Sequence, residues 1–213
     1  MFLPLGDDIQ TRKFPFINIL LIVANVGIFL YYYGTRPDYP QIVEVHGFTP
    51  AHWTWQSIFT SMFLHADPLH LAGNMLFLAI VGDNVEEKYG HLTYAFFYAF
   101  CGVAAVFAHA LMASSDMAGK PTIGASGAVS GIMGAYLVLY PFHTMRVLAL
   151  VIPIKVPAFV FISFWVFTQW LIVKAIERGD ATPVAVWAHI GGFAFGFVVT
   201  VLLRVAGKRA PTR

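Results

Sequence analysis

Residues 124–141 read GASGAVSGIMGAYLVLYP. The stretch is mostly apolar, and Gly127, Gly131 and Gly134 recur along it. Small residues at this spacing allow the backbones of two transmembrane helices to approach closely. A serine hydroxyl is costly at membrane depth, so Ser126 requires a reason for being there. We therefore expect a tightly packed helix that begins at a serine with a role beyond packing.

The composition of the whole chain supports a membrane protein. Hydrophobic residues make up 58% of the 213 residues and charged residues only 11%. Soluble domains carry roughly 25% charged residues, so this chain has too few to cover a globular surface in water. The formal net charge is +2 and no basic run stands apart from the apolar segments, which argues against nucleic acid as a partner.

The apolar segments predict an all-α, polytopic bundle of six transmembrane helices. A helix needs about 20 mostly apolar residues to cross a bilayer. We expect one membrane domain over residues 1–213 with short tails. The loop at 34–65 should lie at the interface, and 142–156, which Pro153 interrupts, should be a connector. The six predicted spans are residues 15–33, 66–82, 91–113, 126–141, 157–176 and 184–205.

Basic residues predict the orientation of the bundle, because cytoplasmic loops carry an excess of Lys and Arg. Six spans leave both termini on one side. That side holds Arg12, Lys13, Lys88, Arg146, Lys155, Arg204, Lys208, Arg209 and Arg213. The opposite side holds Arg36, Lys120, Lys174 and Arg178. We therefore expect both termini in the cytoplasm.

The same topology brings several polar side chains to one depth. Ser126 opens the fourth span from the outside, and His189 lies about five residues into the sixth, roughly 7–8 Å down at 1.5 Å per residue. The second span enters from the same side and carries His65, His70 and Asn74. His70 and Asn74 are four residues apart and share one helix face. Polar groups from three helices in the outer half of the bilayer indicate a site.

Three motifs in these spans resemble a known family. They are HxxxxHxxxN from His65, GASG from Gly124 and AHIGG from Ala188. In order, position and predicted depth they resemble the rhomboid family of intramembrane serine proteases, over about residues 15–205. The stretch Gly82-Asp83-Asn84-Val85-Glu86 is similar to one common in bacterial members. The resemblance implies a six-helix rhomboid-like bundle in a prokaryotic cytoplasmic membrane, with its active site opening to the outside.

The resemblance also implies chemistry, namely hydrolysis of peptide bonds in the transmembrane segments of other proteins. It implies a serine–histidine dyad with no acidic third member, no cofactor and no metal. Ser126 would be the nucleophile and His189 the general base. His70 and Asn74, with the Ser126 N–H, would donate to the oxyanion. Supporting roles would belong to His65, Gly124 and Gly127. The implied partners are transmembrane substrates and membrane lipids.

Two features of the implied site stay open. Some family members carry a tyrosine one turn below the nucleophile, against which the histidine packs, but this chain has Ser130 there. His189 therefore needs another orienting group, and a water or the Ser130 hydroxyl are the two we consider. Substrate would be admitted either past the fifth span, with Phe161, Phe164 and Trp165, or beneath a cap at 177–183.

Simpler interpretations of single residues compete with these roles. A lone serine at a helix start is commonly an N-cap, and His65 at a loop edge suits a structural hydrogen bond. His65, Asp67 and His70 could suggest a metal site, but Asp67-Pro68 is better explained as a helix start.

Rival functions also follow from the sequence. A rhomboid-like protein without catalytic activity would bind or escort membrane clients. A transporter is disfavoured because no pair of inverted repeats is visible. The physiological substrate, the organism and the oligomeric state do not follow from the sequence.

Overall fold

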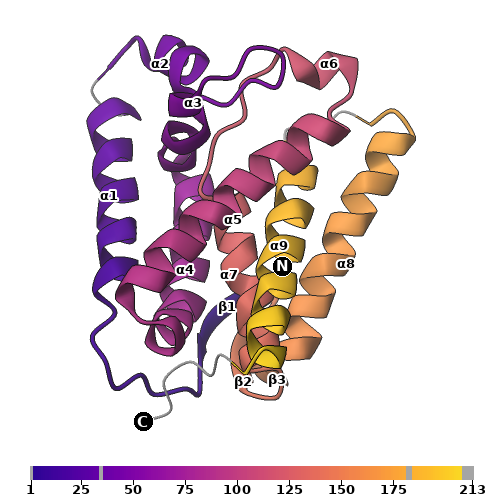
Figure 1. The fold of residues 1–213 in the computed structure, drawn as a ribbon. Coiled ribbons are helices and arrows are strands. Elements are labelled where there is room, and N and C mark those ends of the chain that lie inside the picture. Colours follow the sequence, from indigo (N-terminus) through magenta and orange to yellow (C-terminus); the bar gives the residue numbers. More distant parts are fainter. Residues whose placement is uncertain (1, 34–35, 181–183, 208–213) are drawn as a thin grey trace.

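Apolar helices form a bundle with one small sheet at its base (Figure 1). The computed structural model describes residues 2–33, 36–180 and 184–207. A helix lies over each of the six predicted spans, which confirms the helical membrane bundle. α4 continues beyond its predicted end at residue 82. The six helices are α1 (Phe16–Tyr33), α4 (Pro68–Tyr89), α5 (His91–Met112), α7 (Ser126–Leu139), α8 (Ala158–Glu177) and α9 (Val186–Val205).

The helices differ in their capacity to cross a membrane. Within the described ranges, α1, α5, α8 and α9 are each long and apolar enough to span. α4 is long and apolar enough only when it is counted together with the segment before it. That segment consists of α3 (Trp55–Thr60) and the 3₁₀ turn η1 (Ser61–Phe63), and it meets α4 at an angle of 90°. α7 has only 14 residues, about 21 Å at 1.5 Å per residue. The six helices therefore include four or five full spans, and α7 is a shorter helix inside the bundle.

The contact between α7 and α9 is the most extensive in the bundle, and α5 packs against both helices. Glycines make it possible. A Cβ at Gly192 would overlap the backbone oxygen of Gly127, and one at Gly196 would overlap the oxygen of Gly131. Backbones this close leave no room for a side chain. The glycine motifs thus bring the fourth and sixth predicted spans together, as the sequence predicts.

The sheet at the base was not predicted. β1 (Phe2–Asp7), β2 (Thr144–Ala149) and β3 (Ile152–Pro157) pair antiparallel in the order β1-β2-β3. Residues 142–156 do connect the fourth and fifth predicted spans, but they form a hairpin that pairs with the start of the chain. Pro153 and Pro157 lie on β3, an edge strand, where a missing N–H removes no ladder bond. We call this end of the bundle the sheet end.

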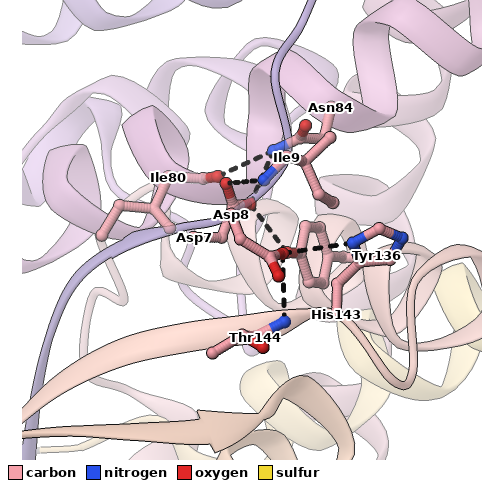
Figure 2. Close-up of polar contacts among 8 residues, drawn as sticks. All are labelled: Asp7, Asp8, Ile9, Ile80, Asn84, Tyr136, His143 and Thr144. Carbon is pink, nitrogen blue, oxygen red and sulfur yellow. Dashed lines mark hydrogen bonds and ion pairs between the residues drawn. The ribbon is translucent and has the colours of Figure 1, made fainter.

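A partly buried carboxylate fastens β1 to the helices above it (Figure 2). Asp7 Oδ2 accepts hydrogen bonds from Asn84 Nδ2 on α4, at 2.8 Å, and from the Tyr136 hydroxyl on α7, at 2.7 Å. Burial raises the pKa of Asp7 above its ordinary 3.8, although the Tyr136 hydrogen bond offsets part of that effect. We call Asp7, Asn84 and Tyr136 the Asp7 latch. It connects the first strand to two of the central helices.

The opposite end carries the remaining short elements, α2 (Tyr39–His46), α3, η1 and α6 (Ser115–Ala118) (Figure 1). The predicted interfacial loop at 34–65 therefore contains two short helices and a 3₁₀ turn, while residues 34–35 lie outside the described part. Phe48 pairs with Thr122 in an isolated bridge, which ties this loop to the segment before α7. We call this end the site end.

Candidate active site

Ser126 is the first residue of α7, and the chain reaches it through an unusual backbone conformation. Gly124 has a φ of +124°, a region that side chains disfavour, and its N–H donates to Ser61 O at 2.8 Å. Ala125 holds the N-cap position, so the Ser126 hydroxyl does not cap the helix. The N-cap interpretation of Ser126 is thus wrong. Its Oγ instead lies 2.8 Å from His189 Nε2.

His189 lies in the first turn of α9 and is held at both ring nitrogens. Nε2 faces Ser126, and Nδ1 lies 2.9 Å from Oε1 of Gln169 on α8. The Ser130 hydroxyl does not orient the ring, because it donates to Ser126 O at 2.6 Å. Trp165, also on α8, lies beside the imidazole with ring centroids 6.2 Å apart. Gln169 is the site residue that sequence reasoning missed.

His70 lies against the loop that leads to the serine. Its Nδ1 accepts a hydrogen bond from the Ala66 N–H at 3.3 Å, so the ring proton belongs on Nε2. A Cβ at Gly124 would come within 2.8 Å of that Nε2, which shows how closely the ring approaches this glycine. The Nε2–H of His70 is therefore a donor directed at the surroundings of Ser126.

Asn74 lies one turn further along α4 and is buried. Its Nδ2 donates to His70 O at 2.8 Å, which uses one of the two amide hydrogens. The second hydrogen is left for another acceptor. Since Ser126 is in the first turn of α7, its N–H has no acceptor within the helix. The predicted oxyanion donors thus come from α4 and the start of α7.

A cavity of about 270 Å³ joins these groups. Its walls carry the four predicted catalytic residues, namely Ser126, His189, His70 and Asn74, together with Ser130. The rest is mainly apolar and includes Leu69, Phe77, Val129, Met133 and Trp165. Polar groups converging on an apolar cavity are typical of a binding or catalytic site. In the described parts of the chain, no group of three or more His, Cys, Asp or Glu side chains could hold a metal ion.

The predicted supporting residues lie behind the cavity wall. His65 is fully buried, its Nε2 lies 3.5 Å from the Ala125 N–H, and its backbone oxygen accepts from the Tyr39 hydroxyl at 2.7 Å. These contacts fit the structural interpretation of His65. A Cβ at Gly127 would overlap that of Ala105 on α5. His65 and Gly127 therefore shape the start of α7 from behind, whereas Gly124 faces the His70 ring that lines the cavity.

The two candidate routes for substrate are past the fifth predicted span and beneath the cap at 177–183. On the fifth predicted span, Phe161 is buried and stacks on Phe77 of α4, with ring centroids 6.1 Å apart. This stack bridges α4 and α8, and Phe77 also lines the cavity. The cap at 177–183 includes residues 181–183, which lie outside the described residues.

The apolar helices and the partly buried serine–histidine pair define a polytopic integral membrane protein with a polar site inside its bundle. Comparison with known proteins identifies the family to which this membrane protein belongs. The model of the rhomboid domain matches residues 52–206, so the chain belongs to the rhomboid family.

Curated relatives agree with this family. RHOMBOID-like protein 1 of Arabidopsis thaliana is 28% identical over 155 residues, which cover 70% of this chain and 34% of that protein. Rhomboid-related protein 2 of Mus musculus is 28% identical over 203 residues, 84% of this chain and 61% of the mouse protein. Rhomboid-like protein 11, chloroplastic, of Arabidopsis thaliana is 34% identical over 114 residues, which cover 53% of this chain and 38% of that protein. The chain spans about a third to three fifths of the length of these relatives.

Proposed function

We propose that this chain is an intramembrane serine endopeptidase that cleaves transmembrane segments of other membrane proteins. The observation that carries the proposal is the 2.8 Å contact between Ser126 Oγ and His189 Nε2. A hydroxyl becomes an effective nucleophile when an adjacent base takes its proton. Both residues line an apolar cavity within the helical bundle, which suits a substrate that arrives from the lipid.

The proposed reaction begins with attack of Ser126 Oγ on the carbonyl carbon of the scissile bond. His189 Nε2 takes the hydroxyl proton as the new C–O bond forms. The electron pair of the carbonyl moves to its oxygen, which the N–H groups of His70, Asn74 and Ser126 would stabilise. One such donor is typically worth about 2.7–4 kcal/mol in the transition state.

The tetrahedral intermediate then collapses, and the C–N bond breaks. His189 returns its proton to the leaving amine nitrogen, and an acyl ester remains on Ser126. Water, deprotonated by the same imidazole, attacks this ester, and the bond between the acyl carbon and Ser126 Oγ breaks. His189 returns its proton to Ser126 Oγ, and the second product leaves with a new carboxyl group. The substrate backbone must be extended at the scissile bond, because a helical carbonyl is already hydrogen-bonded within its helix.

Proteolysis of a model transmembrane substrate in liposomes tests the proposal. We expect cleavage by the wild type and a loss of kcat of about 10⁴-fold or more in Ser126→Ala and in His189→Ala. Ser163→Ala and His52→Ala are matched controls, since both side chains are exposed and distant in sequence from the dyad. Undiminished cleavage by Ser126→Ala would rule out this nucleophile. A wild type that retains the substrate without cutting it would favour the silent relative that binds clients.

The charge distribution supports an orientation for this activity. Six described basic residues belong to the sheet end, namely Arg12, Lys13, Lys88, Arg146, Lys155 and Arg204. Four belong to the site end, and Lys208, Arg209 and Arg213 lie outside the described residues. The positive-inside rule then favours a cytoplasmic sheet end and a site that opens to the outside. Labelling of single cysteines by an impermeant reagent in intact cells would test it, and labelling at the sheet end would contradict it.

A further inference from the structure

The dyad histidine has a third partner that comes from a different helix. His189 Nδ1 lies 2.9 Å from Gln169 Oε1, while Nε2 lies 2.8 Å from Ser126 Oγ. The imidazole is thus bound on both sides, by α7 through one nitrogen and by α8 through the other. The third position of the more familiar serine–histidine–carboxylate arrangement is occupied here by a neutral amide.

Neighbouring groups fix the direction in which the Gln169 amide points. Its Nε2 lies 3.2 Å from Thr168 Oγ1 and 3.5 Å from Trp165 O, both on α8. The Thr168 hydroxyl in turn donates to Trp165 O at 2.6 Å, so Oγ1 is left to accept from the amide. With the amide nitrogen directed at its own helix, the carbonyl oxygen of Gln169 faces His189. The side chain is only 6% exposed, which shields this arrangement from competing water.

The chemistry of an amide oxygen then selects one form of the histidine. Oε1 has no hydrogen and can only accept, so the proton of the neutral imidazole must be on Nδ1. Nε2 consequently keeps its lone pair, which is what abstraction of the Ser126 proton requires. Without the acceptor, a neutral imidazole can carry its proton on Nε2 and lose the ability to act as a base towards Ser126.

We propose that Gln169 is a positioning residue that holds His189 in the Nδ1–H form, so that α8 supplies an essential part of the catalytic group. The inference rests on the proposed protease function for its role in turnover, although the hydrogen bond itself can be tested without turnover. It also explains how the histidine is held in a chain that has Ser130 where some rhomboids have a tyrosine.

The first test is kinetic, on the full-length protein in liposomes. Gln169→Leu removes the acceptor, and Gln169→Met does so at nearly the original length. We expect both to lower kcat about 10- to 100-fold, as loss of an orienting partner does in other sites, with KM unchanged. Gln169→Glu keeps an acceptor oxygen and should retain most of the activity. Gln56→Leu, at an exposed position on α3, is the matched control.

A merely structural role would give a different pattern. Gln169→Leu would then lower the thermal unfolding midpoint, Gln169→Glu would be no better, and KM would change together with kcat. Activity of Gln169→Leu and Gln169→Met equal to that of Gln56→Leu would overturn the inference.

The second test reads the imidazole directly by ¹⁵N NMR of histidine-labelled protein, with His189→Ala for assignment. We expect the Nδ1–H form in the wild type and its loss in Gln169→Leu. An Nε2–H form in the wild type would overturn the inference. A wild type with the Nδ1–H form but no cleavage would instead remove the proposed function and leave the Gln169 contact in place.

Discussion

The two ends of α4 each carry an asparagine, and the two asparagines differ in what their amide hydrogens contact. Asn84, at the sheet end, donates to Asp7, a carboxylate that the chain itself supplies. Asn74, at the site end, has one amide hydrogen on His70 O and lines a cavity with its second hydrogen unassigned. Buried polar groups are normally satisfied within the protein. The sheet end thus uses its polar residues to hold the fold, whereas the site end keeps donors available for a ligand.

The largest expected effect separates these two asparagines. Asn74→Ala should lower kcat about 10²- to 10³-fold, because an oxyanion donor is lost, with a small change in stability. Asn84→Ala should leave kcat nearly unchanged and reduce stability by about 1–3 kcal/mol, since Asp7 loses a buried donor. Parallel kinetics and thermal unfolding of both variants measure this. Equal kinetic losses in the two variants would contradict the division between the ends.

A second prediction concerns the contact between α7 and α9, two helices that run between the sheet end and the site end. We call the close approaches of Gly192 to Gly127 and of Gly196 to Gly131 the glycine seam. Gly196→Val would push its side chain against Gly131 O, and we expect a loss of roughly 1–3 kcal/mol in stability together with lower activity. Gly27→Ala on α1 is the control, because nothing lies within 4 Å of a Cβ there. A Gly196→Val protein as stable as the control would show that the seam is looser than the distances indicate.

The smallest effect is expected from the Asp7 latch. Asp7→Ala leaves the Tyr136 hydroxyl without its acceptor, whereas Asn84 Nδ2 still has Ile80 O and Asp83 Oδ1. The change should therefore cost only about 1 kcal/mol, with kcat unaffected. Asp7→Asn keeps an acceptor and should cost less. Thermal unfolding in detergent, with activity measured in parallel, checks both variants.

The ionisation of Asp7 makes the stability of the fold depend on pH. Because burial raises its pKa in the folded protein above the ordinary 3.8, the folded state holds the proton more tightly than the unfolded state. The contribution of Asp7 to stability is therefore fully present below pH 3.8 and declines as the pH rises through the raised pKa. Asp7→Asn should lack this component, so its stability relative to the wild type should improve as the pH rises. The opposite trend would mean that the latch favours the ionised carboxylate.

Much of the fold was predictable, because a membrane span needs a long apolar run and few other structures do. The glycine spacing also predicted which spans meet. The sheet could not be predicted in the same way. β1 and β2 are more than a hundred residues apart in sequence, and the two prolines of β3 are typical of a loop. Their pairing depends on the bundle bringing the start of the chain beneath α4 and α7.

The site also contains residues that the sequence predicts and one that it does not. Ser126, His189, His70 and Asn74 could be named from motifs and predicted depth, and the structure brings all four to one cavity. Gln169 has no motif. The only signal was an amide in the middle of an apolar segment, which is as costly there as the hydroxyl of Ser126. The cost of this amide marks Gln169 as a residue that needs a partner, but the identity of the partner depends on how α8 is rotated against α9, which the sequence does not specify.

The central claim is that Ser126, activated by His189, is a nucleophile at the site end. The most direct test is mass-spectrometric mapping of the protein after reaction with a fluorophosphonate. We expect an adduct on the peptide that contains Ser126, absent in Ser126→Ala and formed far more slowly in His189→Ala. An adduct on another residue, or a wild type that stays unlabelled, would contradict it.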